Sequence, residues 1–491
     1  MNEILNMTAL ELSAGIKKGE VSCQEAAQAA LNVIRTRQDQ LNTFITVTGR
    51  QALERAAALD RRKGSGPLFG VPGAVKDNLC TQGLRTTCAS LMLERYVPPY
   101  NAGVIDLLDE AGTVLLGKLN MDEFAMGSTS ETSCFGPVKN PWDLSRVPGG
   151  SSGGAAAAVA AGEVWFALGS DTGGSVRQPA AWCGVTGIKP TYGTVSRYGL
   201  VAYASSFDQV GAICRDAADC AAVLDAIQNH DPRDSTGLPG EYGGLLAGLN
   251  GDIRGMRIGM PAQLFGDELD PQVRHRVLDA ARVLRDRGAQ VEECCLPAAD
   301  YALAAYYVIA CAEASSNLAR YDGVHYGKRC AGDVGLEELY LRSRSEGFGS
   351  EVKRRILLGT FVLSEGHYDA YYAKALAARD MVRKSFEELF SQYDLLLAPV
   401  TPSVAPKLGQ SLEHPARMYQ TDSYTVCANL TGLPAMSIPC GQSEGGMPVG
   451  VQLIGPAFGE QTLLNAAHAV QRETHWHKLR PPCFGTGGEG T

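Results

Sequence analysis

The sequence predicts an α/β protein whose β-sheet is mostly covered by helices on both faces. Short apolar segments, typical of buried strands, alternate with longer amphipathic segments along most of the 491 residues. Glycine and proline clusters separate these segments, as expected for the turns of an α/β fold. Because strands that are apolar throughout have both faces buried, we expect helices on both sides of the sheet.

The first 62 residues predict a helical layer packed on the main domain. Thr8 with Glu11, and Ser22 with Glu25, form capping boxes that begin two helices. A further helical segment covers residues 51–62.

Residues 63–480 predict the main domain, and residues 481–491 a flexible tail. The expected strands lie at residues 74–79, 113–119, 164–169, 257–260, 290–295, 394–398, 435–439 and 449–454. The expected helices lie at residues 102–111, 153–161, 217–227, 271–287 and 460–472. Asp270 is the expected N-cap of the fourth helix, with proline at the first helical position. Residues 299–378 are mostly helical in pattern and form an excursion from the sheet.

The composition indicates a globular protein without a disulfide framework. Hydrophobic residues make up 45% and charged residues 20% of the chain, as in ordinary soluble proteins. The net charge of −9 argues against a broad basic surface for nucleic acid. We expect no signal peptide, and no apolar run reaches the ~18 residues of a membrane span. The 14 cysteines show no C-x-x-C spacing, which favours buried free thiols.

Two glycine-rich loops, at residues 147–152 and 171–176, are the most informative part of the chain. They flank the expected helix at 153–161 and strand at 164–169. Each loop carries a serine, Ser151 and Ser175, 24 positions apart. Glycine permits tight turns and close backbone approach, so this arrangement can present two hydroxyl groups for acyl chemistry.

The motifs GGSSGG and DTGGSVRQP in these loops closely resemble the amidase signature family. PLFGVPGAVKD at residues 67–77 and GVQLIG at 450–455 extend the resemblance. It implies the amidase signature fold, with a large mixed β-sheet covered by helices on both faces. Within the family, three further blocks resemble the glutaminase subunits of tRNA-dependent amidotransferases: residues 120–143, 351–361 and 418–434.

Ser175 is the predicted nucleophile. Attack on an amide needs a base for the serine proton and donors aimed at the developing oxyanion. Thr172, Gly173 and Gly174 precede Ser175 and offer consecutive backbone N–H groups in a turn, which suits an oxyanion hole. The resemblance implies the same roles.

By the same resemblance, Ser151 relays the proton and Lys76 is the base. The family places a cis peptide bond before the relay serine, and Gly150 at that position is compatible with one. Ser152 is the competing candidate, but the offset of 24 positions matches Ser151. A lysine must be neutral to accept a proton, so we expect burial to lower the pKa of Lys76 below its usual value of about 10.4.

Arg355 and Asp422 are the predicted substrate-binding residues, with Tyr306 as a third candidate. Free glutamine carries an α-carboxylate and an α-ammonium group, so its recognition needs a cation and an anion. The three positions match those that bind glutamine in the amidotransferase branch. A surface salt bridge is the alternative interpretation for Arg355, which follows Arg354.

The resemblance implies a cytoplasmic glutaminase that supplies ammonia to a carbon–nitrogen ligase. Its implied partners are subunits B and C of a heterotrimer, misacylated Glu-tRNA(Gln) or Asp-tRNA(Asn), and a non-discriminating aminoacyl-tRNA synthetase. ATP and Mg²⁺ are expected on a partner subunit, and no cofactor or metal in this chain. A free-standing amidase of small amides and a non-catalytic scaffold are the alternatives. The branch-specific blocks disfavour the first, and the intact serines and lysine disfavour the second.

Three other motifs are weaker. GTVLLGK at residues 112–118 lacks the Ser/Thr of a phosphate loop and lies in an expected strand. Residues 149–153 fit the G-x-S-x-G elbow of α/β-hydrolases, which would need a histidine such as His325 or His468. His475 and His477 form a short H-x-H that we interpret as incidental.

Overall fold

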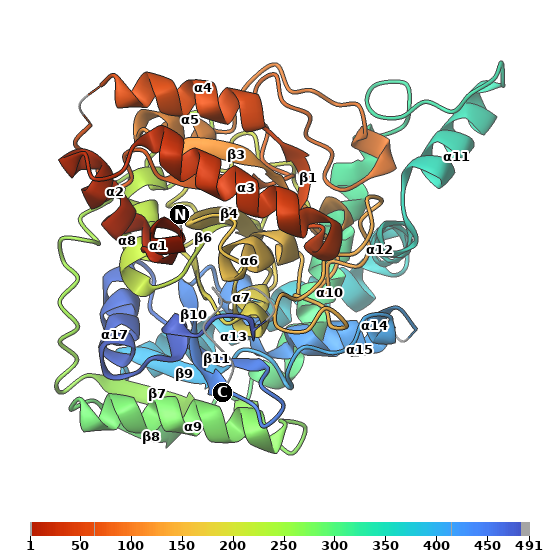
Figure 1. Ribbon diagram of the computed structural model, residues 1–491. Helices are drawn as coiled ribbons and strands as arrows, with labels where there is room; N and C mark the ends of the chain where they lie inside the picture. Colours follow the sequence, from red (N-terminus) through yellow and green to blue (C-terminus); the bar gives the residue numbers. More distant parts are fainter. Residues whose placement is uncertain (1, 63, 414, 483–491) are drawn as a thin grey trace.

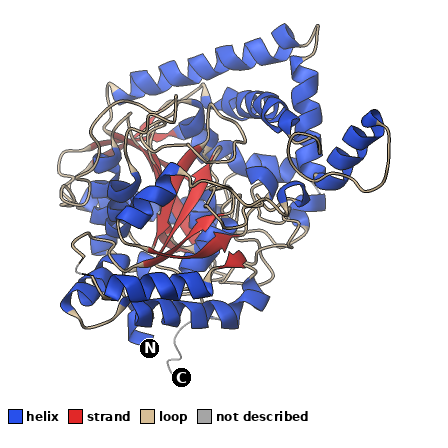
Figure 2. Cartoon of the chain, turned by 90° about the horizontal axis from the view of Figure 1, so that it is seen from above, coloured by secondary structure: helices blue, strands red, loops and turns tan. Residues whose placement is uncertain are grey.

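The computed structural model describes residues 2–62, 64–413 and 415–482, and within them one mixed sheet of 11 strands forms the centre of the molecule (Figures 1 and 2). The strand order is β1-β3-β2-β4-β6-β5-β10-β11-β9-β7-β8. The strands are β1 (Phe44–Val47), β2 (Pro72–Lys76), β3 (Val114–Leu119), β4 (Phe166–Asp171), β5 (Thr186–Lys189), β6 (Gln209–Cys214), β7 (Arg257–Pro261), β8 (Gln290–Cys294), β9 (Leu395–Pro399), β10 (Ala435–Gln442) and β11 (Pro448–Ile454).

The sheet combines parallel and antiparallel pairs, as the family resemblance implied. β2 lies parallel to both β3 and β4, and β7 lies parallel to both β8 and β9. The pairs between these two groups are antiparallel, running from β4 through β6, β5, β10 and β11 to β9. β1 is an antiparallel edge strand on β3.

Helices surround the sheet in Figure 2, in agreement with the predicted covering of both faces. Those of the N-terminal two thirds are α1 (Asn2–Asn6), α2 (Ala9–Lys18), α3 (Cys23–Leu41), α4 (Gly49–Asp60), α5 (Gly103–Glu110), α6 (Gly153–Ala160), α7 (Arg177–Cys183), α8 (Ala217–Ile227), α9 (Pro271–Asp286) and α10 (Ala299–Asn317). The remainder are α11 (Leu336–Gly347), α12 (Ser350–Leu363), α13 (Lys374–Phe390), α14 (Gln410–Glu413), α15 (Pro415–Gln420), α16 (Val426–Leu430) and α17 (Glu460–Glu473). None of the helices in the described ranges has the length and hydropathy that a membrane crossing requires.

The helix starts that the sequence predicted are confirmed. Both capping boxes close in the structure, at the N-termini of α2 and α3. The Asp270 side chain accepts a hydrogen bond from the Gln272 N–H at 2.8 Å and begins α9. Asp219 of α8 accepts from the N–H groups of Ala9 and Leu10, at 2.8 and 3.0 Å, and so fixes the start of α2.

Several elements differ from the sequence prediction. β1, β5 and β6 were not predicted, because β1 and β5 are only four residues long and none of the three has an alternating pattern to distinguish it from a loop. The helical excursion continues beyond residue 378, since α13 runs to Phe390 before the chain returns to the sheet. Residues 483–491 of the predicted tail lie outside the described residues.

α10 and α12 pack closely in this excursion because Gly359 of α12 has no side chain. A Cβ atom at Gly359 would lie 1.9 Å from the Cys311 carbonyl oxygen of α10. That oxygen belongs to the backbone, so the two helices would have to separate to make room.

We therefore expect Gly359→Ala to lower the free energy of unfolding by about 1–3 kcal/mol, the usual cost of overpacking. Urea denaturation of the purified chain measures the change. Gly15→Ala is the matched control, because Gly15 also lies inside a helix, α2, and the nearest atom to the added methyl group is Glu20 Oε2 at 3.6 Å, an ordinary contact distance. Equal stabilities for the two variants would contradict the packing argument.

Candidate active site

The two glycine-rich loops lie side by side at the end of β4. Ser151 and Ser152 lead into α6, and Ser175 lies in the turn between β4 and α7. The Ser152 N–H donates to the Ser175 carbonyl oxygen at 3.1 Å, and the Gly150 N–H donates to Gln178 Oε1 at 2.9 Å. The peptide bond between Gly150 and Ser151 is cis, as the family resemblance implied.

Lys76 meets Ser151 beneath these loops. It is the last residue of β2, and its side chain is fully buried. Its Nζ donates to Ser151 Oγ at 2.7 Å and to Ser170 Oγ at 3.0 Å. Burial lowers the pKa of Lys76 to about 7, although the nearby carboxylates of Asp122 and Asp171 oppose this shift. A substantial fraction of this lysine is therefore neutral near pH 7 and able to accept a proton.

Ser175 is the only one of the three predicted catalytic side chains that reaches solvent. It is 8% exposed, whereas Lys76 and Ser151 are both at 0%. This ordering suits a nucleophile at the surface of a cavity with its proton acceptors behind it. The transfer of a proton from Ser175 to Ser151 remains a prediction.

A buried ion pair between Asp171 and Arg177 holds the nucleophile turn from both ends. Arg177 Nε and Nη2 each donate to the Asp171 carboxylate at 3.0 Å. The same carboxylate accepts from the backbone N–H groups of Gly174 and Val176, at 2.9 and 3.1 Å, on either side of Ser175. Although burial opposes ionisation, the pKa of Asp171 lies well below its usual value because Arg177 faces it.

The hydrogen bonds to Asp171 exclude one of the three predicted oxyanion-hole donors, the Gly174 N–H. Gly174 donates its N–H to Asp171, so that group is not free to face an oxyanion. Within the described residues, the N–H groups of Thr172 and Gly173 donate to no side chain, and they remain the candidate donors. The Thr172 side chain is fixed by a 2.7 Å hydrogen bond to Asp208. Thr425 Oγ1 donates to the Gly173 carbonyl oxygen at 2.6 Å and fixes the second peptide.

Arg355 is a buried cation rather than a surface salt bridge. Its side chain is 2% exposed, while that of Arg354 is 41% exposed. Arg355 Nε donates to Glu351 at 2.8 Å and Nη1 donates to the Tyr203 hydroxyl at 2.6 Å. The guanidinium carbon lies 5.3–5.5 Å from the ring centroids of three tyrosines: Tyr203, Tyr307 and Tyr419. Nη2 is buried without a hydrogen-bond partner among the described residues, so it is available to a carboxylate ligand.

Asp422 supplies the opposite charge nearby. Its carboxylate accepts hydrogen bonds from Ser128 Oγ at 2.8 Å and from the Tyr307 hydroxyl at 2.6 Å. Burial raises the pKa of Asp422 to about 6, so the group is mostly ionised at neutral pH. Tyr307 thus contacts both charged residues, with its ring beside Arg355 and its hydroxyl on Asp422.

Tyr306 connects these charged groups to the nucleophile turn. A Cβ atom at Gly173 would lie 2.5 Å from the Tyr306 hydroxyl oxygen, so only glycine leaves room for this contact. Tyr306 and Tyr307 pack edge to face with centroids 5.0 Å apart. The predicted catalytic and substrate residues therefore belong to one continuous site.

Sequence reasoning missed several residues of this site. Asp171 and Arg177 lie in the quoted DTGGSVRQP motif, and an acid and a base six positions apart around a glycine turn could have indicated their pairing. Ser128, Glu351 and Tyr419 also lie in the quoted blocks but had no distinguishing pattern of their own. Tyr203 lies in none of those blocks, and no sequence signal identifies it.

The weaker motifs do not contribute to the site. Lys118, from the phosphate-loop-like motif, is buried in β3 and pairs with Asp77 at 3.4 Å. His325 is exposed and hydrogen-bonds Asp322 at 2.7 Å. Among the described residues, no group of three or more His, Cys, Asp or Glu side chains is placed to hold a metal ion.

Comparison with known proteins identifies the class of enzyme. Residues 25–464 match the family model of the amidases, so the chain belongs to the amidase family. This match spans the predicted catalytic and substrate-binding residues and the strands that carry them.

Similar proteins narrow the assignment to the amidotransferase branch of that family. The chain is 55% identical to the A subunit of the glutamyl-tRNA(Gln) amidotransferase of Lachnoclostridium phytofermentans, with 96% of this chain and 98% of the relative covered. It is also 55% identical to the protein of the same name from Moorella thermoacetica, covering 98% and 99%. The crystal structure of the corresponding Thermotoga maritima protein is 40% identical, with a TM-score of 0.80 and 97% of both chains covered.

The lowered pKa of Lys76 predicts a pH-dependent rate. We expect kcat/KM for amide hydrolysis to fall as the pH is lowered through about 7, because protonated Lys76 cannot accept the serine proton. Asp422 adds a second loss below about pH 6, since its protonation removes the negative charge that binds an ammonium group. Initial rates with glutamine between about pH 5 and 9 measure both steps. Asp422→Asn should keep the step near pH 7, and a profile without that step would contradict the role of Lys76.

Proposed function

We propose that this chain hydrolyses glutamine and supplies the ammonia to other subunits of an amidotransferase. The observation that carries the proposal is the pair of opposite charges beside the nucleophile turn. Arg355 has a free buried nitrogen, and Asp422 lies on the other side of Tyr307. Together they match the α-carboxylate and the α-ammonium group of a free amino acid. The names of the relatives support the same activity.

In the proposed reaction, Ser175 Oγ attacks the side-chain amide carbon of glutamine. Its proton passes through the Ser151 hydroxyl to the neutral Lys76 Nζ, and the N–H groups of Thr172 and Gly173 stabilise the oxyanion. Lys76 returns the proton to the leaving nitrogen, and ammonia departs. Water then attacks the glutamyl ester on Ser175, with the same residues moving the proton, and releases glutamate.

The partners belong to the same proposal. Relatives are named as the A subunit of a glutamyl-tRNA(Gln) amidotransferase, which supports a multi-subunit assembly. We assign to subunits B and C the ATP- and Mg²⁺-dependent amidation of Glu-tRNA(Gln), and of Asp-tRNA(Asn) if the complex accepts it as a substrate. A non-discriminating aminoacyl-tRNA synthetase supplies these substrates in the cytoplasm.

Ser175→Ala should abolish glutamine hydrolysis by the assembled enzyme while leaving assembly intact. If glutamine serves only as an ammonia source, the variant should still amidate Glu-tRNA(Gln) when ammonium chloride is added. Because triad residues act as a unit, Ser175→Ala with Lys76→Ala should be little worse than either single variant. Ser152→Ala is the matched control for the neighbouring hydroxyl. Residual glutaminase activity in Ser175→Ala would disprove the nucleophile assignment.

Asp422→Asn should raise the KM for glutamine about tenfold or more, because a buried charge of the substrate loses its partner. Arg355→Ala should have the same effect on the carboxylate side. Lys353→Ala is the control, since Lys353 is an exposed cation of the same helix that donates only to the Ser345 carbonyl oxygen and should change KM far less. Propionamide lacks both charges and should be a poor substrate of the unmodified enzyme. Unchanged glutamine kinetics in the first two variants, or a preference for propionamide, would instead support a free-standing amidase.

A further inference from the structure

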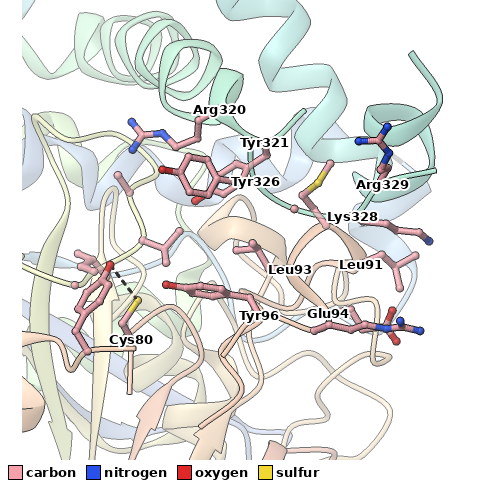
Figure 3. A pocket seen from close by; sticks show the side chains of 18 residues that line it. Cys80, Leu91, Leu93, Glu94, Tyr96, Arg320, Tyr321, Tyr326, Lys328 and Arg329 are labelled. Carbon is pink, nitrogen blue, oxygen red and sulfur yellow. Dashed lines mark hydrogen bonds between the residues drawn. The ribbon is translucent and has the colours of Figure 1, made fainter. Parts of the chain in front are cut away.

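A cavity of about 870 Å³ lies away from the predicted catalytic residues. Three segments form most of its walls: residues 91–96, residues 199–202, and residues 320–321 with 326–329 (Figure 3). Cys80 and Tyr100 complete the lining. The Lys328 N–H donates to the Met92 carbonyl oxygen at 2.8 Å and joins the first wall to the third. None of the catalytic or substrate-binding residues lines this cavity.

The cavity is cationic in a chain whose net charge is −9. Arg95, Arg320, Lys328 and Arg329 line it, with Glu94 as the only acidic residue of the lining. Within the described residues, none of the four cations forms an ion pair. Arg320 makes one hydrogen bond, from Nε to the Asn317 carbonyl oxygen at 2.9 Å. Unpaired cations around a concave surface indicate a site for an anionic ligand.

Tyrosines occupy two opposite walls of the same cavity. Figure 3 shows Tyr96 on one wall and Tyr321 and Tyr326 on the wall facing it. Tyr326 is 63% exposed and Tyr100, also in the lining, is 39% exposed. Exposed tyrosine rings of this kind provide faces on which a planar aromatic group can stack.

We propose that this cavity binds a nucleotide, with its phosphates on the arginines and lysine and its base against the tyrosines. The volume lies within the roughly 300–1,000 Å³ of small-ligand sites. An acidic peptide would satisfy the cations but would leave the tyrosine faces without an aromatic partner, so the combined lining favours a nucleotide. The ligand is either a free nucleotide or the 3′-terminal nucleotides of an RNA, which share this chemistry.

The cavity also borders the glutamine site. Residues 199–202 of its wall lead directly into Tyr203, whose hydroxyl accepts a hydrogen bond from Arg355. The two sites are therefore neighbours that share one stretch of backbone, although they share no lining residue.

Isothermal titration of the full-length chain tests the proposal with four probes: AMP, ATP, a short single-stranded RNA ending in 3′-CCA, and a glutamate-rich peptide. We expect saturable binding of AMP and ATP if free nucleotides are the ligand, and tighter binding of the RNA if its 3′ end is. Arg320→Glu and Arg329→Glu should each weaken nucleotide binding about tenfold or more, through lost charge-assisted hydrogen bonds. Tyr326→Ala should weaken it about tenfold through lost stacking.

Arg35→Glu is the matched control, because this exposed arginine of α3 forms no ion pair among the described residues and lies outside the cavity. It should bind all probes as the unmodified chain does, and every variant should retain glutaminase activity, which reports correct folding. The proposal is overturned if no nucleotide probe binds, or if the cavity variants bind nucleotides as tightly as the control. Binding of the acidic peptide alone would overturn it in favour of a protein partner.

Discussion

The active site depends on the ion pair between Asp171 and Arg177. All five N–H donors of Arg177 are used: two bind Asp171, and the others bind the Thr425 carbonyl oxygen, Gln452 and Asn429. Complete pairing of this kind offsets the high cost of burying a guanidinium group. Asp171 in turn accepts hydrogen bonds from the backbone N–H groups on both sides of Ser175. The position of the nucleophile is thus set by electrostatics in the interior rather than by the flexible glycine turn itself.

Burial also shifts the pKa values of two buried groups in the site, Lys76 and Asp422. It lowers the pKa of Lys76 and raises that of Asp422, because in each case the low-dielectric interior favours the neutral form. Lys76 needs the shift to act as a base. For Asp422 the shift is limited by the hydrogen bonds from Tyr307 and Ser128, which favour the carboxylate. The same physical effect therefore prepares one residue for proton transfer, while hydrogen bonding keeps the other charged for binding.

Much of this architecture could be predicted from the sequence, and the failures have physical causes. α8 and α17 and the capped starts of α2, α3 and α9 follow local rules, so the sequence defined them well. Lys76, Ser151 and Ser175 could be proposed because each lies in a continuous motif that resembles the amidase signature family. Tyr203 and Tyr307 were missed because their importance arises only from distant contacts with Arg355 and Asp422. The status of Gly174 as an oxyanion donor was equally unpredictable, since the competing acceptor depends on the exact fold of the turn.

The long sequence separation within the Arg177 network has a consequence for biosynthesis. Arg177 and Gln452 are 275 positions apart, and Thr425 and Asn429 are nearly as distant. At the usual translation speed, roughly 15–50 s pass between the synthesis of Arg177 and that of its last partner. A nascent chain that already contains Lys76, Ser151 and Ser175 therefore lacks the contacts that fix the turn around Ser175. We therefore expect the proposed glutaminase activity only in chains that are nearly complete.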